Sequence, residues 1–123
     1  SGTECQHSFL QAAHQGTLDV YFDFIYVKGL DTNSKKFLSA NVHAQADLLF
    51  KGKKTKHLHK SLNGNSPSNL VSLDRISPDR IGKIISLYEH KVFIEGVIWD
   101  INSYDQWGVE EGKILAKKNL SKN

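Results

Sequence analysis

The apolar run over residues 19–27, DVYFDFIYV, is the feature that most constrains the fold of this chain. Its aromatic and β-branched residues are typical of a β-strand. Because apolar residues follow one another with few polar interruptions, we expect the strand to be buried on both faces, as in a parallel sheet. A second short apolar run over residues 70–73 is another strand candidate.

Segments with helical periodicity alternate with these strands. Gly16 and Gly52 are C-terminal stop signals, while Ser77 and Pro78 have the character of a helix cap and a first helical residue. Helices alternating with apolar strands predict an α/β layer architecture, and 123 residues suggest one domain. The expected helices cover residues 6–15, 36–51, 78–99 and 104–118. The expected loops cover residues 29–34, 63–68 and 100–103.

Composition limits the cellular setting. The chain is 39% hydrophobic, but charged residues interrupt every apolar run well before the length of a membrane span. The one cysteine, Cys5, excludes an intramolecular disulfide and fits a reducing compartment. We therefore expect a cytoplasmic protein without a membrane partner.

The formal net charge is +3, and much of the positive excess lies in a basic loop over residues 51–62. Such a run could bind phosphate-rich polymers. A solvated loop after a helix, whose C-terminal end favours cations, explains the same charges. Because no aromatic residue lies within residues 51–60 to stack on a base, we expect no nucleic-acid partner and keep nucleic-acid binding as an alternative.

The segment over residues 96–113, GVIWDINSYDQWGVEEGK, carries the strongest chemical signal. Gln106 and Lys113 are seven residues apart, about two helical turns, so in a helix they leave one face roughly 20° out of line. Gly108 and Gly112 keep nearby positions free of side chains, which allows a ligand or another backbone to approach. We therefore expect an amide and an amine to act together here.

This segment resembles the C-terminal signature of the glucose-6-phosphate isomerase family. The match has fixed spacing and is therefore specific. The opening residues 2–7, GTECQH, resemble the family segment that supplies an active-site histidine, at the position of His7. The chain departs from the family pattern at positions such as Glu111, where the family usually has leucine. None of these departures falls on a candidate site residue. The matching positions of the signature are Gly96, Ile98, Trp99, Tyr104, Asp105, Gln106, Gly108, Val109, Glu110 and Lys113.

The resemblance implies a sugar-isomerase (SIS) domain, in which a parallel sheet lies between two layers of helices. Residues 1–123 would form most of the second SIS domain of the family enzyme, without its first strands. The sequence contains no methionine and opens on the segment that resembles the active site. We therefore expect a C-terminal part of a longer enzyme.

The resemblance also implies a reaction, the interconversion of glucose 6-phosphate and fructose 6-phosphate through ring opening and an enediol. His7 would serve the ring oxygen and Lys113 the anomeric hydroxyl, while Gln106 would hold the sugar in register. The family needs no metal or redox cofactor, and it works as a homodimer. Its general-base glutamate, phosphate loop and arginine precede the histidine segment and lie outside this chain, so we expect the chain alone to be inactive.

The histidines have simpler interpretations as well. A histidine such as His7 is suited to acid–base catalysis, but taken alone it is more often structural. His14 lies one heptad beyond His7, which would place both on one helix face. Neither this pair nor His57 and His59 has a third ligand at a metal-binding spacing, so we expect no metal site.

A non-catalytic SIS-type module that binds a phosphosugar is the main alternative. Gln106 and Lys113 could serve binding as well as catalysis. His7 within its GTECQH context distinguishes the two interpretations, because a binding module would not require it.

Overall fold

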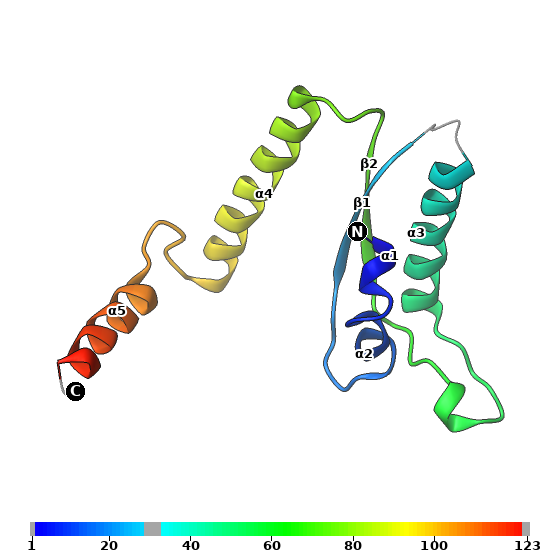
Figure 1. Ribbon diagram of the computed structural model, residues 1–123, viewed down its shortest axis with the longest axis horizontal. Coiled ribbons are helices and arrows are strands. Elements are labelled where there is room, and N and C mark those ends of the chain that lie inside the picture. The colour runs from blue at the N-terminus through cyan, green and yellow to red at the C-terminus, as the bar shows by residue number, and fades with distance from the viewer. Residues whose placement is uncertain (1, 29–32, 122–123) are drawn as a thin grey trace. The chain divides into compact units, whose positions relative to one another are not determined.

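The computed structural model describes residues 2–28 and 33–121. The chain divides into two units, Ser1–Ser77 and Pro78–Asn123, whose positions relative to each other are not determined (Figure 1).

The first unit is built on two parallel strands, β1 (Phe22–Val27) and β2 (Ser68–Leu73). They pair in register from Phe22 opposite Ser68 to Val27 opposite Leu73, and the parallel direction agrees with the parallel sheet predicted from the sequence. The expected burial on both faces is not found, since the β1 residues are half-buried and Ile25 is 44% exposed. Among the described residues the sheet has two strands, so neither is a central strand with both faces covered, as in a larger parallel sheet.

Helix α3 (Asn33–Lys51) contacts both strands and also contacts the short helix α1 (Gly2–Cys5). It begins three residues before the expected start, so Asn33 and Ser34 are helical. The rest of the expected loop, residues 29–32, lies outside the described residues. Helix α3 ends where predicted, at Gly52, whose φ of 65° lies in the left-handed region that glycine adopts without strain.

Helix α2 (Leu10–Gln15) begins four residues later than the helix expected over residues 6–15. Residues 6–9 form a turn, in which the N–H groups of His7 and Ser8 donate to the carbonyl oxygens of Glu4 and Cys5. The Ser8 hydroxyl also donates to the Cys5 oxygen at 3.3 Å, a local bond that competes with helix formation. His7 and His14 therefore do not share a helix face, contrary to the prediction.

The core of this unit lies where α2 and α3 meet. Leu10 and Leu49 are its buried apolar side chains, and His14 is buried with them. The His14 ring nitrogen Nε2 lies 3.2 Å from the Gln45 side-chain oxygen on α3. This contact satisfies a buried polar ring, so His14 has a structural role.

The second unit consists of α4 (Pro78–Trp99), a connection, and α5 (Trp107–Leu120). The bounds predicted for α4 are confirmed. The last helix was expected to begin at residue 104 but begins at Trp107. The Asn102 side chain explains the delay, because its oxygen accepts from the Tyr104 backbone N–H at 3.0 Å and its amide donates to Asp105 at 2.6 Å. None of the described helices combines the length and apolarity needed to cross a membrane.

Candidate functional site

Lys113 lies on α5, and its ammonium nitrogen Nζ donates to Oε1 of Glu110 at 2.8 Å. The two side chains are three positions apart on the helix and are 61% and 54% exposed. Glu110 also lies in the first turn of α5, where a carboxylate is favoured by the helix dipole. The expected helix thus carries the lysine, and its amine is paired with a carboxylate of the same helix.

Gln106 is the residue that precedes α5, not a residue within it. Its φ of −127° and ψ of 44° are not helical, and within the described part of the chain its side chain makes no capping hydrogen bond. Its backbone oxygen accepts from the N–H groups of Val109 and Glu110 at 2.9 and 3.0 Å. The helical spacing that placed the Gln106 and Lys113 side chains on one face therefore does not apply, because it requires both residues to be helical.

Two glycines leave α5 open to approach. A Cβ atom added at Gly108 or at Gly112 would meet no atom within 4 Å in the described structure. The helix therefore has space for another group on both sides of Glu110. That a ligand or another backbone occupies this space stays a prediction.

His7 is exposed and lies in the turn between α1 and α2. The neighbouring Gln6 side chain donates to the Asn41 side chain of α3 at 3.0 Å, which ties this turn to the long helix. His7 belongs to the first unit, whereas Gln106 and Lys113 belong to the second. The structure therefore brings the lysine and its carboxylate together and defines no distance from either to His7.

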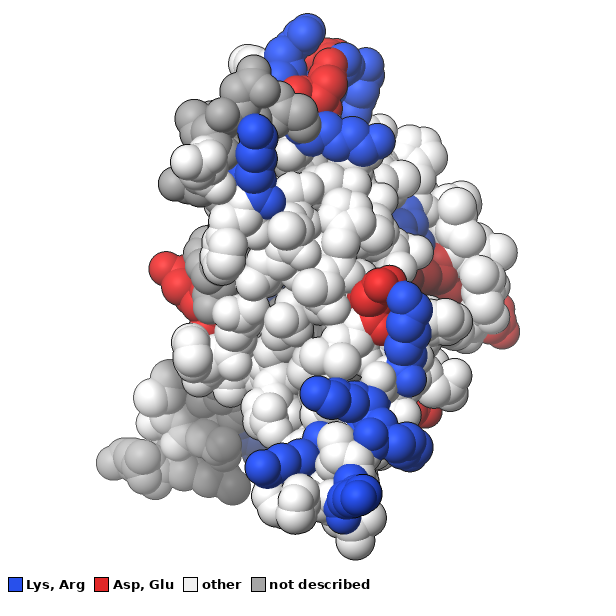
Figure 2. Space-filling model, turned by 90° about the vertical axis from the view of Figure 1, so that its right-hand side faces the viewer, with Lys and Arg blue, Asp and Glu red and all other residues white. Residues whose placement is uncertain are grey.

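The basic loop over residues 51–62 is held in a defined conformation. Lys53 and Leu62 form an antiparallel bridge with backbone hydrogen bonds of 3.1 and 2.8 Å. The Gln15 amide donates to the carbonyl oxygens of His59 and Ser61 at 3.1 and 2.8 Å. Figure 2 shows Lys and Arg side chains gathered at the lower end of the displayed face, where the short helix η1 (Leu58–Lys60) of this loop lies in Figure 1.

Two histidines of the basic loop lie near each other. The His57 and His59 rings lie 5.7 Å apart, centroid to centroid. The described residues contain no group of three or more His, Cys, Asp or Glu side chains that could hold a metal ion. Nucleic-acid binding by this loop stays an untested alternative.

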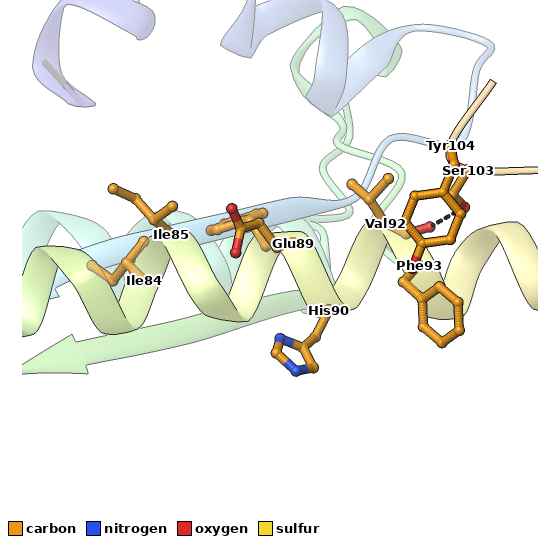
Figure 3. A pocket seen from close by; sticks show the side chains of 9 residues that line it. Ile84, Ile85, Glu89, His90, Val92, Phe93, Ser103 and Tyr104 are labelled. Atoms are coloured by element: carbon orange, nitrogen blue, oxygen red, sulfur yellow. Dashed lines mark hydrogen bonds between the residues drawn. The ribbon is translucent and has the colours of Figure 1, made fainter. Parts of the chain in front are cut away.

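An open apolar groove of about 910 Å³ lies along α4 within the second unit. Figure 3 shows Ile85 and Val92 on one side of the helix and the Ser103 hydroxyl, which donates to the Val92 backbone oxygen at 3.1 Å. No motif of the sequence predicted a site at this groove. The helical spacing of the apolar positions was the available signal, and it indicates a face to be covered rather than a ligand. The groove is lined by Ile84, Ile85, Tyr88, Glu89, His90, Val92, Phe93, Ser103 and Tyr104.

Comparison with known proteins decides the family. A family model described as phosphoglucose isomerase matches residues 1–123. The chain belongs to the phosphoglucose isomerase family. The match includes both the opening segment and the segment over residues 96–113, which confirms the resemblance found in the sequence.

Relatives in the phosphoglucose isomerase family are considerably longer than this chain. Glucose-6-phosphate isomerase 2 of Neisseria meningitidis serogroup A is 42% identical over 136 residues, covering 94% of this chain and 25% of the relative. Glucose-6-phosphate isomerase of Polaromonas naphthalenivorans is 48% identical over 120 residues, covering 94% of this chain and 23% of the relative. The chain thus spans about a quarter of the length of the curated relatives it matches.

A solved structure gives the same result for the fold. The crystal structure of a glucose-6-phosphate isomerase from Chlamydia trachomatis superposes with a TM-score of 0.83 at 40% sequence identity. The superposition covers 98% of this chain and 25% of that chain. The helices and the parallel strand pair are therefore those of a phosphoglucose isomerase family member, while the roles of His7, Gln106 and Lys113 stay predictions.

Proposed function

We propose that this chain supplies part of the sugar site of a glucose-6-phosphate isomerase, with His7, Gln106 and Lys113 as its contributions. The observation that carries this proposal is the family match over residues 1–123, which includes the segments of all three residues. The chain would form most of an SIS domain of a cytoplasmic homodimer, in which the histidine reaches the site of the neighbouring subunit.

The proposed reaction begins with a closed sugar ring. Ring opening requires one proton delivered to the ring oxygen and one removed from the anomeric hydroxyl, and a positioned histidine and lysine can do both. We assign His7 to the ring oxygen and Lys113 to the anomeric hydroxyl. Gln106 would bind the sugar and keep it in register, where small displacements are costly in rate.

The open sugar then passes through an enediol as a proton moves between its first two carbons. In this proposal a glutamate outside residues 1–123 moves that proton, and the phosphate group is also bound outside the chain. We accordingly expect the purified 123-residue chain to show no isomerase turnover. Turnover by this chain, with host enzyme excluded, would refute that expectation.

The assignment is tested in a longer polypeptide that contains this chain and turns over glucose 6-phosphate. We expect His7→Ala and Lys113→Ala each to lower kcat about 100-fold or more, the contribution typical of a positioned acid or base. Lys118→Ala removes a charge from the last turn of the same helix and serves as the matched control, with kcat expected to stay within about twofold of the wild type. Steady-state kinetics with thermal unfolding of each variant measures both effects.

The same experiment separates catalysis from binding alone. A phosphosugar-binding module would bind glucose 6-phosphate without turnover, and His7→Ala would leave that binding intact. Such a result would favour the non-catalytic alternative over the isomerase.

A further inference from the structure

Glu110 makes contact with both predicted site residues of the second unit. Its backbone N–H donates to the Gln106 backbone oxygen at 3.0 Å, and its side-chain Oε1 accepts from Lys113 Nζ at 2.8 Å. The first bond is the usual backbone bond of a first helical turn, so the side-chain bond to Lys113 is the one that depends on glutamate. Glu110 is not a substitute for the general-base glutamate, which the proposed function places outside residues 1–123.

The ion pair with Glu110 restricts the rotamers that the Lys113 side chain can adopt. A lysine side chain has four flexible carbon–carbon links and loses considerable rotamer entropy when it is held in place. Glutamate three positions before lysine is a favourable order on a helix, since it agrees with the helix dipole. A lysine ammonium group has three N–H donors, so the bond to Glu110 leaves two for a ligand.

The Glu110–Lys113 ion pair lies on a part of α5 that a ligand can reach. Gly108 and Gly112 lie on either side of Glu110 in the sequence, and neither presents a side chain to the space beside the helix. Both charged groups are more than half exposed. An exposed pair of this kind contributes little to folding stability, so its effect should be found in the placement of the amine rather than in the stability of the protein.

We propose that Glu110 is a positioning residue that holds the Lys113 ammonium group in the orientation used on the sugar. The inference rests on the proposed function of Lys113. It adds that the lysine acts as a pair with this carboxylate, and that the neighbouring Glu111 has no such part.

The test uses the full-length isomerase that contains this chain, with Glu110→Gln, Lys113→Ala and the double variant. Glu110→Gln should lower kcat about fivefold to tenfold with less than about a twofold change in KM, because the amine is misplaced while the remaining sugar contacts stay. In the Lys113→Ala background the same substitution should cause no further loss, because residues that act through one another are non-additive. Glu110→Asp, which keeps the charge on a shorter side chain, should restore part of the lost kcat.

Glu111→Gln is the matched control, since it removes the same charge from the next position of α5, and the described residues show no ion pair for Glu111. Its kcat and the unfolding temperatures of all variants should stay at the wild-type values. Equal losses from Glu110→Gln in both backgrounds, or no loss in either, would overturn the positioning role. Full activity of Lys113→Ala would instead overturn the proposed function on which the inference rests.

Discussion

At the scale of single residues, two side chains of the same type can differ widely in exposure, and the sequence does not show which of them is buried. Leu49 is 1% exposed, whereas Leu58 in the basic loop is 89% exposed. Both are leucines beside lysine-rich sequence, so composition alone does not distinguish them. Leu49 lies on α3 and belongs with Leu10 to the core of the first unit, whereas Leu58 lies in the short helix η1 of the loop.

We expect Leu49→Ala to lower the free energy of unfolding of the first unit by about 2–5 kcal/mol, since it removes a fully buried side chain and leaves a cavity. Leu58→Ala is the matched control and should change it by less than about 0.5 kcal/mol. Urea unfolding of the 123-residue chain, followed by circular dichroism, measures both. Similar losses for the two variants would contradict the burial seen here.

The glycines at positions 52 and 64 also have surroundings that the sequence does not show. Gly52 and Gly64 both have positive φ angles, of 65° and 72°, and their backbones lie against each other. A Cβ atom at Gly52 would lie 2.7 Å from the Leu62 carbonyl oxygen and 2.8 Å from the Gly64 nitrogen. The sequence predicted Gly52 as a helix stop, and this close approach is a second requirement for glycine that became visible only in the fold.

At the scale of elements, the connection from α4 to α5 depends on Gly96. This glycine is buried, and the backbone N–H of Ile101 donates to its carbonyl oxygen at 2.8 Å. A Cβ atom at this position would collide with the Ser103 hydroxyl and lie 2.9 Å from the Ile101 oxygen. The chain after α4 can therefore fold back against the helix only because residue 96 has no side chain.

We expect Gly96→Ala to destabilise the second unit by about 1–3 kcal/mol, because the connection must move to accommodate the methyl group. Gly82 on the same helix is the control, since a Cβ atom there would meet nothing within 4 Å. Gly82→Ala should raise stability by up to about 1 kcal/mol through helix propensity. Opposite signs of the two changes in thermal unfolding are the expected result, and destabilisation by both would argue against the contact.

At the scale of the whole molecule, much apolar surface is exposed. The exposed large hydrophobic residues of α4 include Ile85, Val92 and Phe93, which line the groove, as well as Ile98 and Trp99. The parallel strands β1 and β2 pair with each other, and each has one edge without a partner strand among the described residues. Exposed apolar patches and free strand edges both promote association.

We expect the 123-residue chain to self-associate, with a weight-average mass in sedimentation experiments that rises with protein concentration. Ile25→Lys places a charge on the exposed part of β1 and should reduce this association, since charged side chains protect strand edges. Lys28→Arg, just beyond the strand, keeps the charge and should leave association unchanged. A constant monomer mass over the concentration range would contradict the expectation.

The sequence by itself determined the family, the presence of two strands in a parallel sheet and several helix ends. These features follow from neighbours along the chain, such as a proline at the start of α4 or a glycine after α3, and from the fixed spacing of the segment over residues 96–113. The tertiary structure decided that His14 is buried, that Gly96 must lack a side chain, and that Gln106 precedes its helix while Glu110 contacts Lys113. The first two depend on contacts with Gln45, Ile101 and Ser103. The last depends on which of several competing local hydrogen bonds forms, and hydrophobic periodicity does not determine that choice.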